Sequence, residues 1–172
     1  MALNITSFIS FIGAILLVIL YSFDPIKVSF KDSTNVAELE VYNFVMYELN
    51  KEALQSVSAG QSGSKFNDRV EAKKIDFTSN GDGNLQNIVA DRAVYDYKLL
   101  KLEKNVNYIR EDGTLFNSET LFYDKKENLI YTKSDFSSEK GKNSVNGLNL
   151  AYNIKTTQLT AKNIVAKFDI KD

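Results

Sequence analysis

One hairpin pattern occurs three times in the second half of the chain and constrains the fold more than any other feature. Each copy is centred on a tyrosine, and Tyr95, Tyr123 and Tyr152 are 28 and 29 residues apart. A small residue lies five positions before each tyrosine, an apolar residue two positions before it, and another apolar residue seven positions after it. In chain order these are Ala90, Ala93 and Leu102; Ser118, Leu121 and Ile130; and Gly147, Leu150 and Leu159. We therefore expect three similar β-hairpins in which the tyrosine and the residue at +7 share one face of a sheet.

Turn-forming residues separate strand-length segments through most of the chain. Clusters rich in Gly, Asn, Asp and Ser occur at 59–64, 79–84, 111–113, 124–128 and 138–144. Several segments alternate apolar and polar residues, as in the final stretch Ile164 to Ile170. No sustained helical period follows residue 65. The pattern predicts an all-β, antiparallel fold with about ten or more short strands.

The segment from Val41 to Val57 fits two kinds of secondary structure. A helix would place Val41, Phe44, Val45 and Leu49 on one face. The same stretch is rich in aromatic and β-branched residues, which favour strands. We favour strands because the segments that follow are strand-like.

The composition argues against most enzymes. The chain of 172 residues contains no histidine and no cysteine. This excludes Ser/His and Cys/His nucleophilic sites and the usual zinc ligand sets. A formal net charge of −1 provides no basic field for nucleic acid. We therefore expect no catalytic residues, no metal site, no cofactor and no nucleic-acid partner.

The N-terminal residues 1–23 are predicted to form a transmembrane anchor. Residues 2–23 contain no charged side chain, and a run of about 20 apolar residues spans the hydrocarbon core of a bilayer. A cleaved signal peptide is less consistent with this stretch, because no Lys or Arg precedes it and no small-x-small cleavage site follows it. A buried core helix is a second alternative, but it would normally carry a polar face.

Pro25, the only proline in the chain, marks the end of this segment. Residues 24–40 are polar and mixed, as in an extended tether, and residues 41–172 are predicted to be the working domain. Lys27 and Lys31 follow the apolar run. The positive-inside rule alone therefore gives no support for placing the domain outside the cytoplasm.

The repeated tyrosines and their apolar partners allow two interpretations. They fill an ordinary β-sheet core, or they line a lumen that stays partly empty for an apolar guest, because sequence does not reveal whether a core is full. The acidic residues in the turns are expected to be solvated rather than paired for catalysis. The stretch 80–84, NGDGN, lacks the ligand spacing of a calcium loop and is predicted to be a turn.

Several segments together resemble the LptC-type proteins of lipopolysaccharide export. They are the apolar N-terminal run, the segment LEVYNFVMYELN at 39–50, and the repeat ADRAVYDYKLLKLEKNV at 90–106. The repeat continues into REDGTLFNSETLFYDKKENLIYTKSDF at 110–136. The resemblance extends over essentially the full chain.

This resemblance implies a twisted, open antiparallel β-jellyroll in the periplasm, held by one helix in the bacterial inner membrane. Such a protein receives lipopolysaccharide from an ABC transporter, and its anchor packs against the transporter's membrane subunits. The acyl chains lie in a hydrophobic groove and pass to a soluble periplasmic bridge protein. The C-terminal edge strand pairs with that protein, and the family itself is not enzymatic.

From the repeat and the resemblance together we predict a set of lipid-binding residues: Phe44, Met46, Tyr95, Leu102, Leu121, Tyr123, Ile130, Phe136, Leu150, Tyr152 and Leu159. The predicted partner edge strand carries Ile164, Ala166, Phe168 and Ile170, because a long alternating strand at the end of a sheet suits β-augmentation. One rival is a membrane-anchored structural protein such as a pilin-like subunit, which would need a basic leader and an early glutamate in its helix. Another is an anchored carboxylate-dependent glycosidase, which would need two converging acids.

Overall fold

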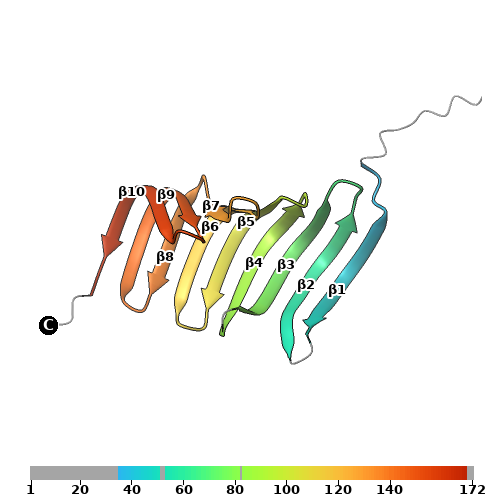
Figure 1. The fold of residues 1–172 in the computed structure, drawn as a ribbon, viewed down its shortest axis with the longest axis horizontal. Helices are drawn as coiled ribbons and strands as arrows, with labels where there is room; N and C mark the ends of the chain where they lie inside the picture. The colour runs from blue at the N-terminus through green and yellow to red at the C-terminus, as the bar shows by residue number, and fades with distance from the viewer. Residues whose placement is uncertain (1–34, 51–52, 82, 170–172) are drawn as a thin grey trace, which may run out of the picture. The chain divides into compact units, whose positions relative to one another are not determined.

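The computed structural model describes residues 35–50, 53–81 and 83–169, which all belong to one compact unit, Thr34–Asp172. These residues form ten strands of one antiparallel sheet (Figure 1). The strands are β1 (Leu39–Leu49), β2 (Leu54–Lys65), β3 (Val70–Gly81), β4 (Asn84–Tyr95), β5 (Leu99–Arg110), β6 (Thr114–Asp124), β7 (Leu129–Tyr131), β8 (Asp135–Lys140), β9 (Asn143–Asn153) and β10 (Gln158–Lys167). The predicted all-β antiparallel class is confirmed, as is the preference for strands over Val41 to Val57.

The predicted anchor at 1–23 and most of the tether at 24–40 lie outside the described residues. The first strand, β1, begins at Leu39, so the last two residues assigned to the tether belong to the sheet. Within the described ranges, no helix is long and apolar enough to cross a membrane.

Neighbouring strands in the sheet follow the order of the chain. β1 to β7 pair consecutively, β9 pairs with β7, and β10 pairs with β9. β8 pairs with both β6 and β9, so β7 and β8 together fill one strand position between those two. The described sheet therefore has two outer strands, β1 at one end and β10 at the other.

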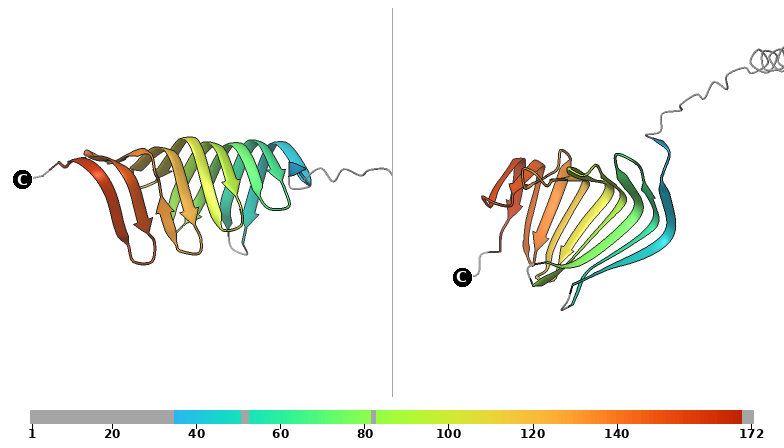
Figure 2. Two further views of the ribbon diagram at one scale, coloured as in Figure 1. Left: turned by 90° about the horizontal axis from the view of Figure 1, so that it is seen from above. Right: turned by 45° about the vertical axis from the view of Figure 1, so that its right-hand side comes forward.

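Most strands bend near their midpoint, and the sheet folds into a trough (Figure 2). Several residues inside the strands have positive φ, which only a few non-glycine residue types adopt readily. They are Asn43, Lys74, Lys104, Asn105, Asn149 and Asn163. The pairing register also shifts near this line in β4, β5 and β10. The bend divides the sheet into an upper half and a lower half, in the orientation of Figure 1.

The strands are longer than predicted, since eight of the ten have 10 to 12 residues. One reason is that the Gly- and Ser-rich stretch 59–64 lies inside β2 and is not a turn. The ring of Phe44 covers this stretch, and a Cβ added at Gly60 would come within 2.7 Å of Phe44 Cε1. The glycines therefore serve the close packing of an aromatic ring.

A cluster of hydroxyl groups holds the break between β7 and β8 against β6. Thr132, only 2% exposed, has its Oγ1 3.0 Å from the Ser118 hydroxyl and 3.3 Å from that of Thr120. The same oxygen accepts a hydrogen bond from the Ser134 N–H at 3.1 Å. Buried polar groups require such partners, so Thr132 fixes the point at which one strand position changes from β7 to β8.

We expect Thr132→Val to lower the free energy of unfolding by about 1 to 3 kcal/mol, because the new side chain has the same shape but can neither accept the Ser134 N–H nor bond to the hydroxyls of Ser118 and Thr120. Thr132→Ser keeps the hydroxyl and is the matched control. Denaturant unfolding of the three proteins would test this, and equal midpoints for Thr132→Val and the wild type would contradict it.

Candidate functional site

One row of side chains crosses the inner face of the upper half from β4 to β10. Directly opposed residues of antiparallel strands point to the same face. The paired positions are Tyr95 with Leu100, Leu100 with Tyr123, Tyr123 with Ile130, Ile130 with Tyr152, and Tyr152 with Leu159. We call this row the upper lip; every member is aromatic or aliphatic.

The register explains the spacing of the three repeats. In the second and third copies the residue at +7 is the direct partner of the tyrosine. In the first copy the turn is shorter and Leu100 takes that place, while Leu102 pairs with Ala93. Leu102 still lies on the same face as Tyr95, since it is two residues from Leu100. The expectation that both positions share a face is confirmed.

A second row forms the facing wall in the lower half. The paired positions run from Phe77 in β3 to Val145 in β9, and every member except Ser138 is apolar or aromatic. In strand order the row contains Phe77, Ile88, Tyr108, Phe116, Ser138 and Val145. Because the sheet bends between the two rows, their side chains border a common space.

That space is a cavity of about 810 Å³. Residues from every strand between β3 and β10 line it. At its closed side a small core cluster of Ala90, Leu102 and Val106 lies at the bend. Its volume lies within the range of about 300 to 1,000 Å³ that ligand pockets usually have, and its walls offer mainly apolar contacts.

Eight of the predicted lipid-binding residues line this cavity: Leu102, Leu121, Tyr123, Ile130, Phe136, Leu150, Tyr152 and Leu159. The other three do not. Phe44 packs over Gly60 and Gly63, and Met46 on β1 is 62% exposed. Tyr95 belongs to the upper lip, but its ring contacts Tyr97 and its hydroxyl donates to the Tyr97 carbonyl at 3.2 Å.

Sequence reasoning missed most of the lower wall, including Phe77, Ile88, Tyr108 and Phe116. The tyrosine repeat covers only the upper half of each hairpin. An alternating pattern was available in Tyr108 and Arg110, and in Phe116 and Thr114. It did not show which of the two faces would be the inner one after the bend.

The predicted edge residues lie at the free end of the sheet. Ile164 in β10 is half exposed and also lines the cavity, whereas Ala166 is exposed opposite Val145. Phe168 is exposed but follows the last residue of β10. Ile170 lies outside the described residues. The outermost strand thus combines cavity-lining and exposed apolar side chains.

The outer face of the upper half is charged, in contrast to the inner face. Glu71 receives Arg69 Nε at 2.7 Å and Arg92 Nη2 at 2.8 Å, and Arg92 also donates to Glu103 at 2.8 Å. Hydrogen bonds from Arg92 and then Arg69 lower the pKa of the Glu71 carboxyl. Because these ion pairs are favourable in water, they keep the outer face of the sheet in contact with solvent, and the apolar inner face borders the cavity.

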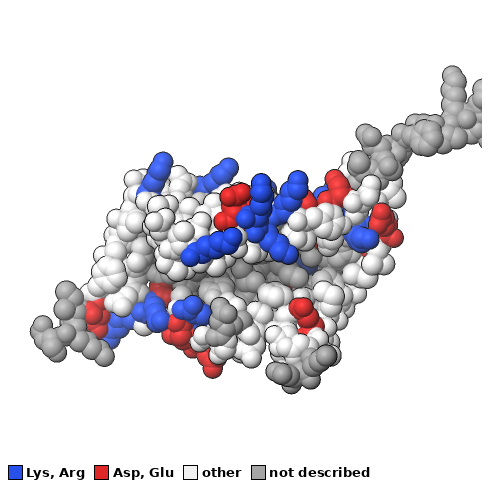
Figure 3. Space-filling model, in the orientation of Figure 1, with Lys and Arg blue, Asp and Glu red and all other residues white. Residues whose placement is uncertain are grey.

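Figure 3 shows Lys and Arg side chains mixed with Asp and Glu along the upper and lower edges of one side of the sheet. The middle of that side is recessed and mostly uncharged. On this side of the domain the charged side chains therefore lie mainly away from the recess.

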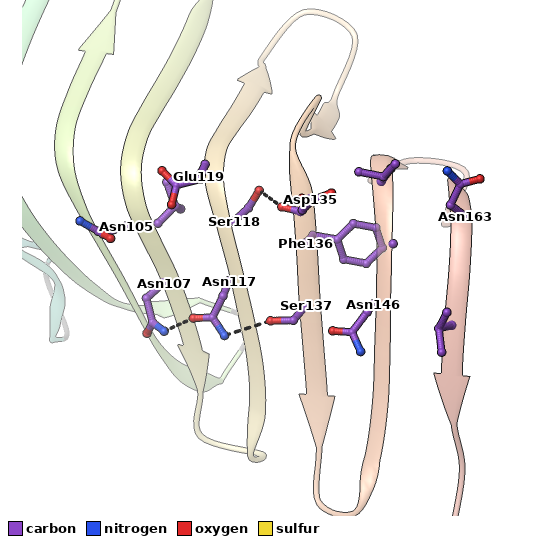
Figure 4. A pocket seen from close by; sticks show the side chains of 14 residues that line it. Asn105, Asn107, Asn117, Ser118, Glu119, Asp135, Phe136, Ser137, Asn146 and Asn163 are labelled. Atoms are coloured by element: carbon purple, nitrogen blue, oxygen red, sulfur yellow. Dashed lines mark hydrogen bonds between the residues drawn. The ribbon is translucent and has the colours of Figure 1, made fainter.

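A second hollow, of about 900 Å³, lies near the bend, and most of the residues that line it are polar (Figure 4). Asn107 donates to Asn117 Oδ1, and Asn117 Nδ2 donates to Ser137 Oγ at 3.4 Å. These bonds join β5, β6 and β8, as cross-strand polar pairs do in other sheets. The amide ladder therefore serves the pairing of the strands.

Among the described residues, no group of His, Cys, Asp and Glu side chains could hold a metal ion, and the carboxylates of Glu71 and Glu103 pair with arginines. A bent antiparallel sheet with a largely apolar cavity along its inner face and two outer strands defines a class of open, single-sheet β-proteins.

Comparison with known families assigns the chain within this class. Residues 8–166 match the family described as lipopolysaccharide-assembly, LptC-related, and the chain belongs to that family. Its members are non-enzymatic proteins of lipopolysaccharide assembly and transport in the cell envelope. A search of curated proteins found no match.

Proposed function

We propose that this protein receives lipopolysaccharide from an inner-membrane ABC transporter and passes it along the cavity to a soluble periplasmic bridge protein. In this proposal, residues 1–23 anchor the chain beside the transporter's membrane subunits, and the bent sheet acts as an open β-jellyroll in the periplasm. The protein is passive, and ATP hydrolysis by the transporter supplies the energy.

The observation that carries the proposal is the extent of the apolar cavity. It runs from Phe77 in β3 to Leu159 and Ile164 in β10. Acyl chains are held there by burial of apolar area at about 25 cal/mol per Å². Such contacts are non-directional, which suits a ligand that has to slide.

The free edge of β10 supports transfer to a partner. Among the described strands β10 pairs only with β9, so its outer side can accept another strand by β-augmentation. Leu159 and Ile164 line the cavity on this same strand. A partner sheet added there would extend the groove without a gap, and Ala166 and Phe168 would lie at the junction.

Photo-crosslinking in cells that make labelled lipopolysaccharide tests the proposal. We expect a benzophenone amino acid at Tyr123 or Tyr152 to capture the lipid. The matched control is Tyr131, which stacks on Phe122 with ring centroids 4.8 Å apart and is not among the cavity-lining residues. Labelling at Tyr131 equal to that at Tyr123, or absence of labelling at both inner positions, would refute the proposal.

A further inference from the structure

The cavity is amphipathic, because its lower rim differs from its upper lip. At the ends of the lower half the inward positions are paired as Ser79 with Gln86, Gln86 with Arg110, Thr114 with Lys140, and Lys140 with Asn143. We call this set the polar rim. All of its members are polar, whereas the upper lip is entirely aromatic or aliphatic.

Arg110 is the only charged residue among those that line the cavity. Its guanidinium donates from Nε and Nη2 to Asp112 at 3.0 and 2.7 Å, and Lys140 Nζ reaches the same carboxylate at 2.6 Å. The Arg110 side chain is 40% exposed and that of Lys140 is 59% exposed. Both cations can therefore be reached from the mouth of the cavity.

The charges of this cluster do not cancel. Hydrogen bonds from Arg110 and then Lys140 hold the pKa of the Asp112 carboxyl well below its usual range, so this group is ionised near neutral pH. Among these three side chains two cations share one carboxylate, so one positive charge is left over. The neighbouring Glu111 accepts the Leu85 N–H at 3.1 Å, which directs its carboxylate toward the backbone at the start of β4.

We propose that the polar rim binds the anionic, phosphate-bearing headgroup of the amphiphile whose acyl chains occupy the cavity. Arg110 and Lys140 are the binding cations. Guanidinium groups suit phosphate, because their planar N–H donors match its oxygens. This inference rests on the proposed function and adds to it a direction: the headgroup lies at the lower rim and the acyl chains extend toward the upper lip.

Lysines at the upper end of the domain provide a matched comparison. Lys125 and Lys155 lie in the exposed turns that follow β6 and β9, and neither is among the cavity-lining residues. Replacing both lysines removes the same charge as replacing Arg110 and Lys140, but at the end of the domain opposite the polar rim.

The test uses the full-length chain in phosphatidylcholine nanodiscs, with a benzophenone amino acid at Tyr123. The probes are bisphosphorylated lipid A and its dephosphorylated form with the same acyl chains. We expect the wild type to be labelled about tenfold more by the phosphorylated probe, the scale of one charge-assisted contact. Arg110→Gln with Lys140→Gln should remove this preference, so that the two probes label the variant to the same extent, and labelling by the dephosphorylated probe also shows that the variant is folded. Lys125→Gln with Lys155→Gln should keep the preference.

Lys140→Gln alone guards against a fold defect in the double variant, because its exposed side chain does not line the cavity; we expect it to lower the preference severalfold. Equal labelling of the wild type by both probes would overturn the headgroup site and leave the lipid groove in place. Loss of the preference in the Lys125→Gln, Lys155→Gln variant alone would also overturn the headgroup site. Displacement of both probes by inorganic phosphate would overturn it as well. No labelling by either probe would overturn the proposed function itself.

Discussion

Replacing Ile130 with glutamate is expected to stop lipid from reaching the β10 end of the groove. Ile130 lies in the middle of the upper lip, paired with Tyr123 on one side and Tyr152 on the other. A carboxylate there would have to lose its water to acyl chains at a cost of several kcal/mol. Since about 1.4 kcal/mol corresponds to a tenfold change in affinity, labelling through a crosslinker at Tyr152 should fall by more than about tenfold.

Two controls separate this effect from a fold defect. Ile130→Val keeps an apolar side chain at the same position and should retain nearly full labelling. Tyr131→Glu introduces the same charge one residue further, where the side chain stacks on Phe122, and should also leave labelling at Tyr152 largely intact. Normal labelling of the Ile130→Glu protein would contradict the path along the upper lip.

The upper lip could be predicted from sequence because its geometry is local. A tyrosine and the residue at +7 are separated by one tight turn, and the period of two in a strand then fixes their common face. The pairs Tyr123 with Ile130 and Tyr152 with Leu159 follow this rule directly. Even the shorter turn after Tyr95 preserves the face, since it moves the register by two residues.

The lower wall could not be predicted in the same way, because the bend interrupts the period of two. Ala90 and Ala93 are three residues apart, yet Ala90 belongs to the inner core cluster and Ala93 packs against it. The register shift between Val89 and Arg92 inserts the extra residue. Alternation counted from Tyr95 therefore assigns Ala90, Ile88 and the residues before them to the wrong face.

Some residues at the bend could have been recognised from the sequence. Asparagine tolerates positive φ better than most residues, and Asn43, Asn149 and Asn163 adopt it inside strands. Their presence within otherwise strand-like segments could have marked the bend. Lys74 and Lys104 adopt the same conformation, and nothing about lysine predicts it. In these strands the packing of the two halves decides the conformation.

The hydrophobic core is small because the interior is a cavity. Its buried cluster contains only Ala90, Leu102 and Val106 among the described residues, and Val106 is 1% exposed. We expect Leu102→Ala to lower the free energy of unfolding by about 2 to 5 kcal/mol, the usual range for deleting a buried leucine. This is a large share of the roughly 5 to 15 kcal/mol that stabilises a typical domain. Pulse proteolysis of the full-length chain would measure it.

Leu159→Ala is the matched control, because Leu159 lines the same cavity but is 57% exposed; its cost should stay within about 0.5 kcal/mol, as for most surface substitutions. If acyl chains complete the core, lipid should stabilise both variants, since a ligand at 100 times its Kd contributes about 2.7 kcal/mol. If lipid restores the free energy of unfolding of the Leu102→Ala protein, bound acyl chains contribute to the same core as Leu102. Equal costs for the two leucines without lipid would contradict the assignment of Leu102 to the core.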